Sequence, residues 1–449
     1  MRKIFLSFLG TNDYLTCTYF GKGIEPVENV RFIQEATLSA YCRHWNEWDQ
    51  GFIFVTKGSK SMNWVDNGQQ KRLEEKGICE GLESRISKLK LPFPIEPVEI
   101  PEGFTEEQIW EIFQIVFDRL ESQDNVLFDI THAFRSIPVL AMVVLNYARV
   151  LKNISIKGIY YGAFEALGTT SEVKEKPLAE RRAEILDITA LETLLAWSGA
   201  IDGFLKSGNA RQIKALAAEE FGTIRKNDPD SRAVAASFEK LASSISTFCD
   251  AITTCRGPQI PWVTNQVQQK LAEVQAILEQ PTEVAMGRAF RPLFDHLQGE
   301  VEAFRGAPIN GGIQAAQWCL EHGLIQQGYT ILQETLITFF VKKIGADPLD
   351  KKARELVPSA AKIVNENLSR DHWRGESAKP ENGDRVEHLR GVFRDDKEIL
   401  KLFSRLSQER NDLNHAGYSG DKKDSKKFFS NLDEHIKKAV LFLDRKDKG

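Results

Sequence analysis

Three apolar segments near the start of the chain, each followed at once by a polar loop, constrain the fold most. Lys3–Leu9, Gly51–Thr56 and Asn125–Ile130 are rich in Ile, Leu, Val and Phe, which is typical of strands buried in a parallel sheet. Amphipathic helical patterns lie between them, as at Thr105–Leu120, where Thr105 suits the N-cap position. Strands that alternate with helices predict a mostly parallel, doubly wound α/β domain.

Other segments of residues 1–170 fit the same architecture. Lys157–Phe164 has the composition of another strand, whereas Asn29–Arg43 fits either a helix or an extended segment. The helix expected from Pro138 to Val150 is apolar almost all round. A helix without a polar face is buried on two sides, and a subunit interface is one way to cover the second side.

The polar loops after the strands are the candidate ligand site, because ligands of doubly wound sheets bind beyond the carboxyl ends of the strands. These loops supply backbone amides, hydroxyls, one imidazole and two cations, which suit phosphates and nucleobase edges. The candidate ligand-binding residues are Gly10, Thr11, Asn12, Asp13, Lys57, Thr131, His132 and Arg135. The chain has neither a GxGxxG nor a Walker lysine motif, so a dinucleotide or P-loop site is disfavoured.

Two residues of the third loop have structural explanations as well. His132 is either a ligand contact or a core histidine satisfied by a backbone carbonyl, and its spacing leaves both open. Asp129, at the end of a strand, is more typical of a carboxylate that fixes the following turn than of a catalytic group.

From about Ala179 the pattern is helical, which predicts an all-α C-terminal half. Helices are expected at 186–205, 210–221, 231–252, 263–278, 318–344 (interrupted near Gly323) and 397–416. Gly306–Gly312 is the clearest hinge, and residues 369–385 are expected to form a loop. This pattern divides the chain into residues 1–170, a connecting region 171–320 and a C-terminal domain 321–449.

The helix expected at Lys397–Ala416, with Gly417 as its stop signal, carries an unusual arginine. Arg410 falls in the middle of the apolar stripe of this helix, and Asn411 and His415 lie one turn apart on an adjoining face. An arginine on a buried seam is costly unless it is paired or lies at an interface. Pairing with a carboxylate, with His415 as a helix-end cation, is the plain explanation, and a catalytic site is the other.

Composition narrows the class of protein. At 449 residues the chain is too long for one ordinary core, and 42% hydrophobic with 27% charged residues describes a soluble globular protein. Neither a membrane span nor a secretion signal is expected, and six scattered cysteines without metal-ligand spacing suggest reduced thiols in the cytoplasm and no structural metal. A net charge of −4 argues against broad binding of duplex nucleic acid.

Motifs in both halves resemble known families. FDITHAFRSIP at 128–138 resembles the Asp-x-Thr-His-Gly-x-Arg signature of CRISPR-associated Rossmann-fold (CARF) sensor proteins, with Ala133 in place of the usual Gly. FLGTNDY at 8–14 is similar to the first ligand loop of that family, and LDIT at 186–189 also fits. ERNDLNHAG at 409–417 resembles the Arg-x4-6-His motif of HEPN ribonucleases, and GYTILQETLITFF at 328–340 resembles an earlier helix of the same domain. Residues 200–320 resemble neither family well.

The resemblance implies a Rossmann-like sensor domain followed by a HEPN-like domain, in an allosteric effector of type III CRISPR antiviral defence. A cyclic oligoadenylate would bind across a homodimer, or a higher homo-oligomer, as an activator rather than a cofactor. Arg410, Asn411 and His415 of two protomers would then form a composite site that cleaves single-stranded RNA. Arg410 and His415 are separated by about 140° on one ideal helix, which favours two helices meeting over one chain alone.

The residues are compatible with that chemistry. RNA supplies its own nucleophile, the 2′-OH, so that an imidazole for proton transfer and a guanidinium for the phosphate are enough without a metal. One alternative is a cyclic-oligonucleotide sensor or ring nuclease without significant RNA cleavage. Another is a HEPN toxin or nucleotide-binding scaffold whose N-terminal domain binds a different ligand. An RNA-degradation assay with and without cyclic oligoadenylates separates the three.

Overall fold

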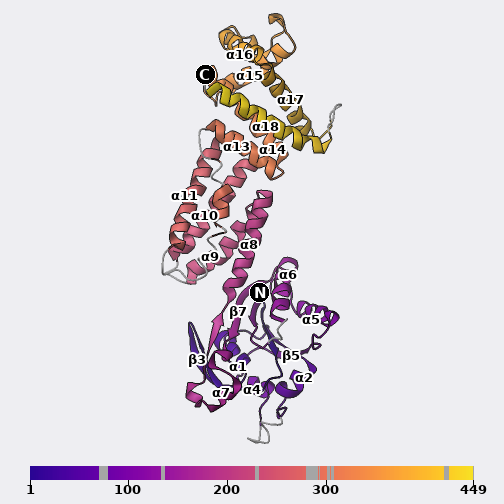
Figure 1. The fold of residues 1–449 in the computed structure, drawn as a ribbon, viewed down its shortest axis with the longest axis vertical. Helices are drawn as coiled ribbons and strands as arrows, with labels where there is room; N and C mark the ends of the chain where they lie inside the picture. Colours follow the sequence, from indigo (N-terminus) through magenta and orange to yellow (C-terminus); the bar gives the residue numbers. More distant parts are fainter. Residues whose placement is uncertain are drawn as a thin grey trace. The chain divides into compact units, whose positions relative to one another are not determined.

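The computed structural model describes residues 1–69, 79–132, 137–227, 232–279, 292, 294–300, 304, 308–418 and 424–447. The chain divides into two compact units, Met1–Thr193 and Leu194–Gly449 (Figure 1). The first is built on a β-sheet, and all regular elements that the structure describes in the second are helices. In the described part of the chain, no helix has the length and apolar character that crossing a membrane requires.

The sheet of the first unit has eight strands, in the spatial order β3-β2-β8-β7-β6-β1-β4-β5. The strands are β1 (Lys3–Leu9), β2 (Cys17–Gly21), β3 (Ile24–Val30), β4 (Gln50–Val55), β5 (Ile95–Glu99), β6 (Asn125–Asp129), β7 (Ser155–Gly162) and β8 (Arg182–Asp187). Only β2–β3 and β7–β8 pair antiparallel, so the prediction of a mostly parallel sheet is confirmed.

Four of these strands are absent from the prediction. β3 and β5 are the two edge strands, and each contains a proline, Pro26 and Pro97, which normally argues against a strand. β8 lies in a segment where a helix was expected from residue 186 and pairs with both β7 and β2. The sheet therefore continues past residue 170, and the first unit ends at Thr193.

Helices cover both faces of the sheet, as Figure 1 shows. The helical segments of this unit are α1 (Ile33–Thr37) with a π-helical turn (Leu38–Cys42), α2 (Lys57–Ser59) with another (Lys60–Trp64), α4 (Leu82–Lys88), α5 (Glu106–Asp118), α6 (Ile137–Lys152) and α7 (Thr170–Glu175). Alternate residues of β1 serve the two cores: Phe5 packs on the side of α1 and α4, and Leu6 on the side of α5 and α6. The doubly wound arrangement follows from this alternation.

Local signals for helix ends are accurate in this unit. The Thr105 hydroxyl accepts a hydrogen bond from the Gln108 N–H at 3.3 Å and caps α5, as predicted. The ambiguous segment Asn29–Arg43 contains the end of β3, the short helix α1 and the π-helical turn.

The helix α6 departs from its prediction, because a single chain buries only one of its faces. Ala141, Val144, Leu145 and Ala148 are buried against the sheet. On the opposite face, Val139 is 68%, Val143 53%, Tyr147 45% and Val150 75% exposed. The expected burial on two sides is therefore not met within one chain, and an apolar face of α6 is left uncovered.

One hydrophobic cluster extends through the second unit, from Trp197 to Leu443, and joins the predicted connecting region to the C-terminal region. Its helices are α8 (Thr189–Ser207, which begins in the first unit), α9 (Arg211–Asn227), α10 (Arg232–Thr253), α11 (Ile260–Leu278), α13 (Pro308–Glu321), α14 (Ile325–Lys343), α15 (Lys351–Asn365), α16 (Gly383–Asp395), α17 (Lys397–Asn414) and α18 (Ser425–Asp447). The expected loop at 369–385 contains three short 3₁₀ turns and the start of α16.

The predicted hinge at Gly306–Gly312 is wrong where the structure describes it, because residues 308–312 form the first turns of α13. A Cβ at Gly312 would overlap the Thr335 hydroxyl, so this glycine allows α13 to pack closely against α14. The predicted interruption near Gly323 is confirmed: that residue has a φ of +71° and separates α13 from α14.

Candidate functional sites

The three polar loops of the first unit lie together at one edge of the sheet. Leu9 pairs with Val55 and Ser7 with Asp129 in parallel register, so the loops that follow these strands leave on the same side. A Cβ added at Gly58 would lie 3.5 Å from Thr11 Cγ2, which shows how close the first two loops are. We call this group of loops the ligand edge.

The first loop, Gly10–Asp13, is held by two buried amides that the sequence analysis missed. Asn63 Nδ2 donates to the carbonyls of Gly10 and Asn12 at 2.8 and 2.9 Å. Gln69 Nε2 donates to the carbonyl of Thr11 at 3.2 Å and to Asn63 Oδ1 at 3.0 Å. No local pattern marks Asn63 or Gln69, because their contacts with the first loop join residues more than 50 positions apart in the chain. The loop is therefore fixed before any ligand arrives.

The candidate ligand-binding residues of these loops differ in whether their side chains already interact with other residues of the chain. Asp13 faces the Arg31 guanidinium at 3.7 Å and is engaged within the chain. Lys57 is exposed at the first position of α2 and has no carboxylate partner among the described residues. Arg135 and Ala133 lie outside the described residues. Lys57 is thus a cation that this edge offers to an anionic ligand.

Asp129 fixes the turn after β6, as predicted. Its Oδ1 accepts hydrogen bonds from the Thr131 hydroxyl at 2.6 Å and the Thr131 N–H at 3.0 Å, and its Oδ2 accepts one from the Ser7 hydroxyl at 3.0 Å. The Thr131 hydroxyl also accepts from the Gly162 N–H at 2.8 Å. The Thr131 hydroxyl therefore stabilises this turn, although Thr131 was predicted to contact a ligand.

His132 follows this turn with its ring beside that of Tyr14, at 4.1 Å between centroids. Although the residue is partly exposed, its Nε2 is enclosed and has no hydrogen-bond partner among the described residues. Burial lowers the pKa of His132 to about 3, so the imidazole is neutral near pH 7. Tyr14 packs against Gly10 as well, because a Cβ there would overlap the Tyr14 hydroxyl. Tyr14 is therefore a further side chain of the ligand edge, besides Asn63 and Gln69, that was not among the predicted ligand-binding residues.

The free energy of unfolding should depend on the protonation of Asp129. Burial raises the pKa of Asp129 to about 6, against the hydrogen bonds from Thr131 and Ser7, which lower it. Because this value exceeds that of the unfolded chain, about 3.9, the stabilising contribution is present below pH 4 and lost as the pH rises through 6. As the pH is raised from 4 to 7.5, we expect the free energy of unfolding of Asp129→Asn to rise relative to that of the natural protein by up to about 3 kcal/mol.

Denaturant unfolding of both proteins at the two pH values measures this difference. Ser87→Ala, which removes an exposed hydroxyl of α4 that donates only to a backbone carbonyl, is the control and should show no such pH dependence. If the free energies of unfolding of Asp129→Asn and the natural protein differ by the same amount at both pH values, folding does not change the pKa of Asp129.

The C-terminal candidates lie at the end of α17, whose apolar stripe is as predicted. Ile399, Leu402, Phe403 and Leu406 are buried. The helix ends at Asn414, the His415 N–H donates to the Asn411 carbonyl at 2.9 Å, and Gly417 has a φ of +74°. The predicted stop is therefore confirmed, and it places His415 at the helix end.

Arg410 is held by α14 of its own chain. Its Nη1 donates to Gln333 Oε1 at 3.1 Å and lies 3.7 Å from Glu334 Oε1. Glu334 is oriented in turn by Arg354, whose Nη2 donates to Glu334 Oε2 at 2.5 Å. The Arg410 side chain is 29% exposed, so its guanidinium reaches the surface although its Nε is buried without a partner among the described residues. The predicted pairing of this arginine with a carboxylate is confirmed.

Asn411 and His415 are exposed, and no hydrogen bond or ion pair joins His415 to Arg410 among the described residues. The arrangement in one chain thus presents a fixed guanidinium and a separate imidazole. This separation agrees with the angle of about 140° between the two residues on an ideal helix.

A buried polar network beside Arg410 is the main feature that sequence reasoning missed. Glu409 is 2% exposed and accepts hydrogen bonds from the Tyr329 hydroxyl at 2.7 Å and Asn431 Nδ2 at 2.8 Å. His435 Nε2 lies 2.8 Å from the same carboxylate and is 3% exposed at the residue level. The network ties α17 to α14 and α18 one residue before Arg410. The sequence Glu409-Arg410 did not reveal this network, because adjacent residues of a helix point to different sides.

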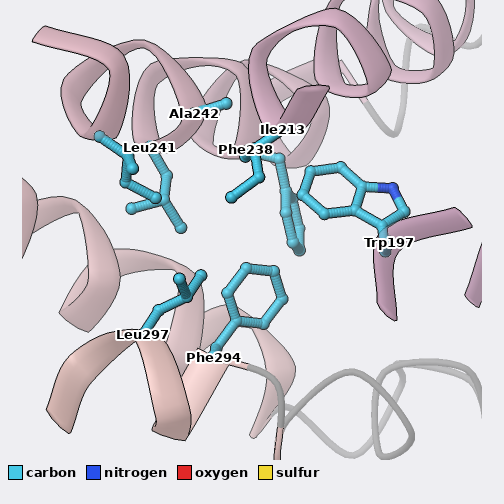
Figure 2. A pocket seen from close by; sticks show the side chains of 8 residues that line it. Trp197, Ile213, Phe238, Leu241, Ala242, Phe294 and Leu297 are labelled. Atoms are coloured by element: carbon cyan, nitrogen blue, oxygen red, sulfur yellow. The ribbon is translucent and has the colours of Figure 1, made fainter. Parts of the chain in front are cut away.

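Two other features of the described residues carry no chemistry of this kind. Figure 2 shows a small pocket in the second unit, lined by apolar side chains such as Phe238, Leu241 and Phe294, which is part of the hydrophobic core. No group of three His, Cys, Asp or Glu side chains in the described residues is arranged to hold a metal ion.

Comparison with known proteins gives a family match within the first unit. Residues 55–165 match the model of the CARF domain of the CRISPR system endoribonuclease Csx1. The match begins at the end of β4 and contains Lys57, Thr131, His132 and Arg135, but not Arg410 or His415. The chain is also 24% identical over 200 residues to CRISPR-associated protein MJ1674 of Methanocaldococcus jannaschii. That alignment covers 43% of this chain and 30% of the relative, so the chain spans less than a third of that protein. The first unit therefore carries a domain similar to the CARF domain of Csx1, in a chain related to CRISPR-associated proteins.

Proposed function

We propose that this chain is an endoribonuclease of type III CRISPR antiviral defence, activated by a cyclic oligoadenylate, that cleaves single-stranded RNA without a metal. The observation that carries the proposal is the combination, in one chain, of a CARF-like ligand edge with Arg410 held at the surface by Gln333 and Glu334 next to a helix end that presents His415.

The ligand edge suits a cyclic oligonucleotide. Lys57 supplies an exposed cation that no carboxylate of the described residues pairs, and the neutral His132 supplies a ring nitrogen that the same residues leave without a partner. Asn63 and Gln69 fix the first loop, so that binding does not have to order it. A small anion with repeated bases and phosphates can bind the same loops of two protomers at once.

The uncovered face of α6 supports a homodimer of this domain. Val139, Val143 and Tyr147 recur at helical spacing on that face and would be covered by a second copy. Because α6 begins directly after the loop that carries His132, a ligand that changes this loop can change how two α6 helices pack. The dimer is then the element that both sites share.

Cleavage requires little from the protein, because the RNA contains the nucleophile. The 2′-OH attacks the adjacent phosphorus and loses its proton, the bond from phosphorus to O5′ breaks, and O5′ takes up a proton. His415 is suited to these proton transfers. Arg410 cannot lose its own proton and stabilises the charge that develops on the phosphate oxygens, while Asn411 orients either group.

This chemistry predicts cleavage in excess EDTA at the rate seen without it. The products should carry a 2′,3′-cyclic phosphate or a 3′-phosphate and a 5′-OH, because the 2′-OH is the nucleophile. End-labelled RNA treated with phosphatase and kinase distinguishes these ends from 3′-OH ends. An absolute requirement for Mg²⁺ or Mn²⁺, or 3′-OH products, would exclude the 2′-OH mechanism.

The second candidate is a sensor of cyclic oligonucleotides, or a ring nuclease that degrades them, without significant RNA cleavage. It is favoured by the reach of the family match, which ends at residue 165, far before Arg410. Incubation of the full chain with single-stranded RNA, with and without cyclic oligoadenylates of several ring sizes, separates the two. RNA cleavage that depends on the activator supports the nuclease. Degradation of the cyclic oligoadenylate without RNA cleavage supports the ring nuclease.

A further inference from the structure

The C-terminal end of α10 lies against α14 close to Arg410, although α10 belongs to the region that resembles neither family well. The Thr253 carbonyl accepts a hydrogen bond from Gln327 Nε2 at 3.5 Å. Two residues later, the Cys255 thiol is hydrogen-bonded to Thr330 of α14. Burial raises the pKa of Cys255, and the charges of Arg410 and Arg256 oppose that rise, so both guanidinium groups act on the same thiol.

Arg256 has a fixed backbone and an exposed side chain. The chain leaves α10 through Cys255, whose φ is +56°, and the Arg256 N–H donates to the Ala251 carbonyl at 2.7 Å. The side chain is exposed and forms no ion pair with a carboxylate among the described residues, the exposed Asp250 included. Arg354, by contrast, is paired with Glu334.

Polar side chains connect this end of α10 with the end of α17. Gln327 faces α10, and the preceding residue, Gln326, donates from Nε2 to Asn414 Oδ1 at 3.2 Å. Asn414 is the last residue of α17 and precedes His415. Arg256, Gln327, Gln326 and Asn414 thus mark a polar strip that two hydrogen bonds join, from the turn after α10 through the start of α14 to the end of α17, next to His415 in the chain. We call it the α10–α17 strip.

We propose that the α10–α17 strip binds the backbone of single-stranded RNA and that Arg256 holds one of its phosphates. The inference rests on the proposed function and adds to it a substrate-binding residue from the middle helices. A planar guanidinium that no carboxylate of the described residues pairs can bind a phosphate in two-point geometry, and side-chain amides bind sugars and base edges. Because the whole chain has a net charge of −4, RNA binding needs local cations of this kind. The structural alternative is that Arg256 only balances the dipole of α10.

Kinetics of Arg256→Glu test the assignment in the full chain with activator. We expect the KM for single-stranded RNA to rise about tenfold, the scale of one charge-assisted hydrogen bond, while kcat changes less than twofold. Arg256→Lys should recover part of the affinity. Lys240→Glu is the matched control, because Lys240 is an exposed cation of α10, the helix that Arg256 follows, and the charge change is identical.

Binding of a 2′-O-methyl RNA oligonucleotide, which lacks the nucleophile, tests the same contact without cleavage. The slope of log affinity against log salt should fall by about 0.7 in Arg256→Glu, the value for one phosphate of a single strand. A role in the dipole of α10 would instead lower the melting temperature and leave KM and the salt slope unchanged.

The outcomes separate this inference from the proposed function. If the natural protein cleaves RNA and Arg256→Glu matches Lys240→Glu in KM, affinity and salt slope, the inference is overturned and the nuclease stands. If the natural protein binds the oligonucleotide through Arg256 but cleaves no RNA, the strip stands and the nuclease fails. If the natural protein neither binds nor cleaves RNA, both fail.

Discussion

His415→Ala is expected to cleave RNA at least about 100-fold more slowly than the natural protein at saturating activator, because positioned proton transfer contributes roughly 10²–10⁴. His415 lies at the end of α17, where its side chain is exposed and only its backbone is bonded. Folding should therefore be unaffected, and the melting temperature should stay within the error of the measurement.

Arg410→Ala is expected to lose cleavage to a similar extent, but with some loss of stability. Removal of the guanidinium leaves Gln333 without this donor and Glu334 with Arg354 alone. Arg410→Lys keeps the charge and loses the planar fork, so it should fold well and still cleave poorly if the fork positions the phosphate.

Single-turnover cleavage of a labelled RNA measures these effects, with His388→Ala as the control. His388 is an exposed histidine on α16, away from the end of α17 in sequence. Near-natural cleavage by well-folded His415→Ala protein would remove His415 from the mechanism and leave the C-terminal unit without its proposed activity.

His132→Ala is expected to abolish activation by cyclic oligoadenylate while the unliganded activity and the dimer remain. If the active arrangement is populated at about 1% without ligand, raising it to about 99% needs a differential affinity of roughly 10⁴, about 5.5 kcal/mol. His132 contributes an enclosed ring nitrogen, packed on Tyr14 and rigidly placed after the turn that Asp129 holds. Loss of the His132 ring should therefore weaken ligand binding and lower the population of the active arrangement. Arg135→Ala, in the same signature, should act in the same direction.

Titration of activator against each variant, together with calorimetry of ligand binding, measures the coupling. His44→Ala serves as the control, because His44 is an exposed histidine of the same unit outside the ligand edge. Light scattering reports whether the dimer persists. If His132→Ala and Arg135→Ala bind and respond like the natural protein, the sensor assignment of this loop is wrong, whatever the C-terminal unit does.

Sequence alone determined the features that depend on neighbouring residues. β1, β4, β6 and β7 were located to within about two residues, since runs of buried apolar side chains identify central strands. The cap of α5 at Thr105 and the stop of α17 at Gly417 follow from the chemistry of single positions. The convergence of the three loops also followed, because parallel strands have their carboxyl ends on one side.

Tertiary structure decided everything that depends on contacts between distant segments. The edge strands β3 and β5 form despite their prolines because each needs only one hydrogen-bonded neighbour. Arg410 is oriented by Gln333 and Glu334, and the first ligand loop by Asn63 and Gln69, through bonds that no periodicity encodes. The periodicity of a helix shows which residues share a face. It does not show which other segment, or which other chain, covers that face, since this depends on how all the elements pack together.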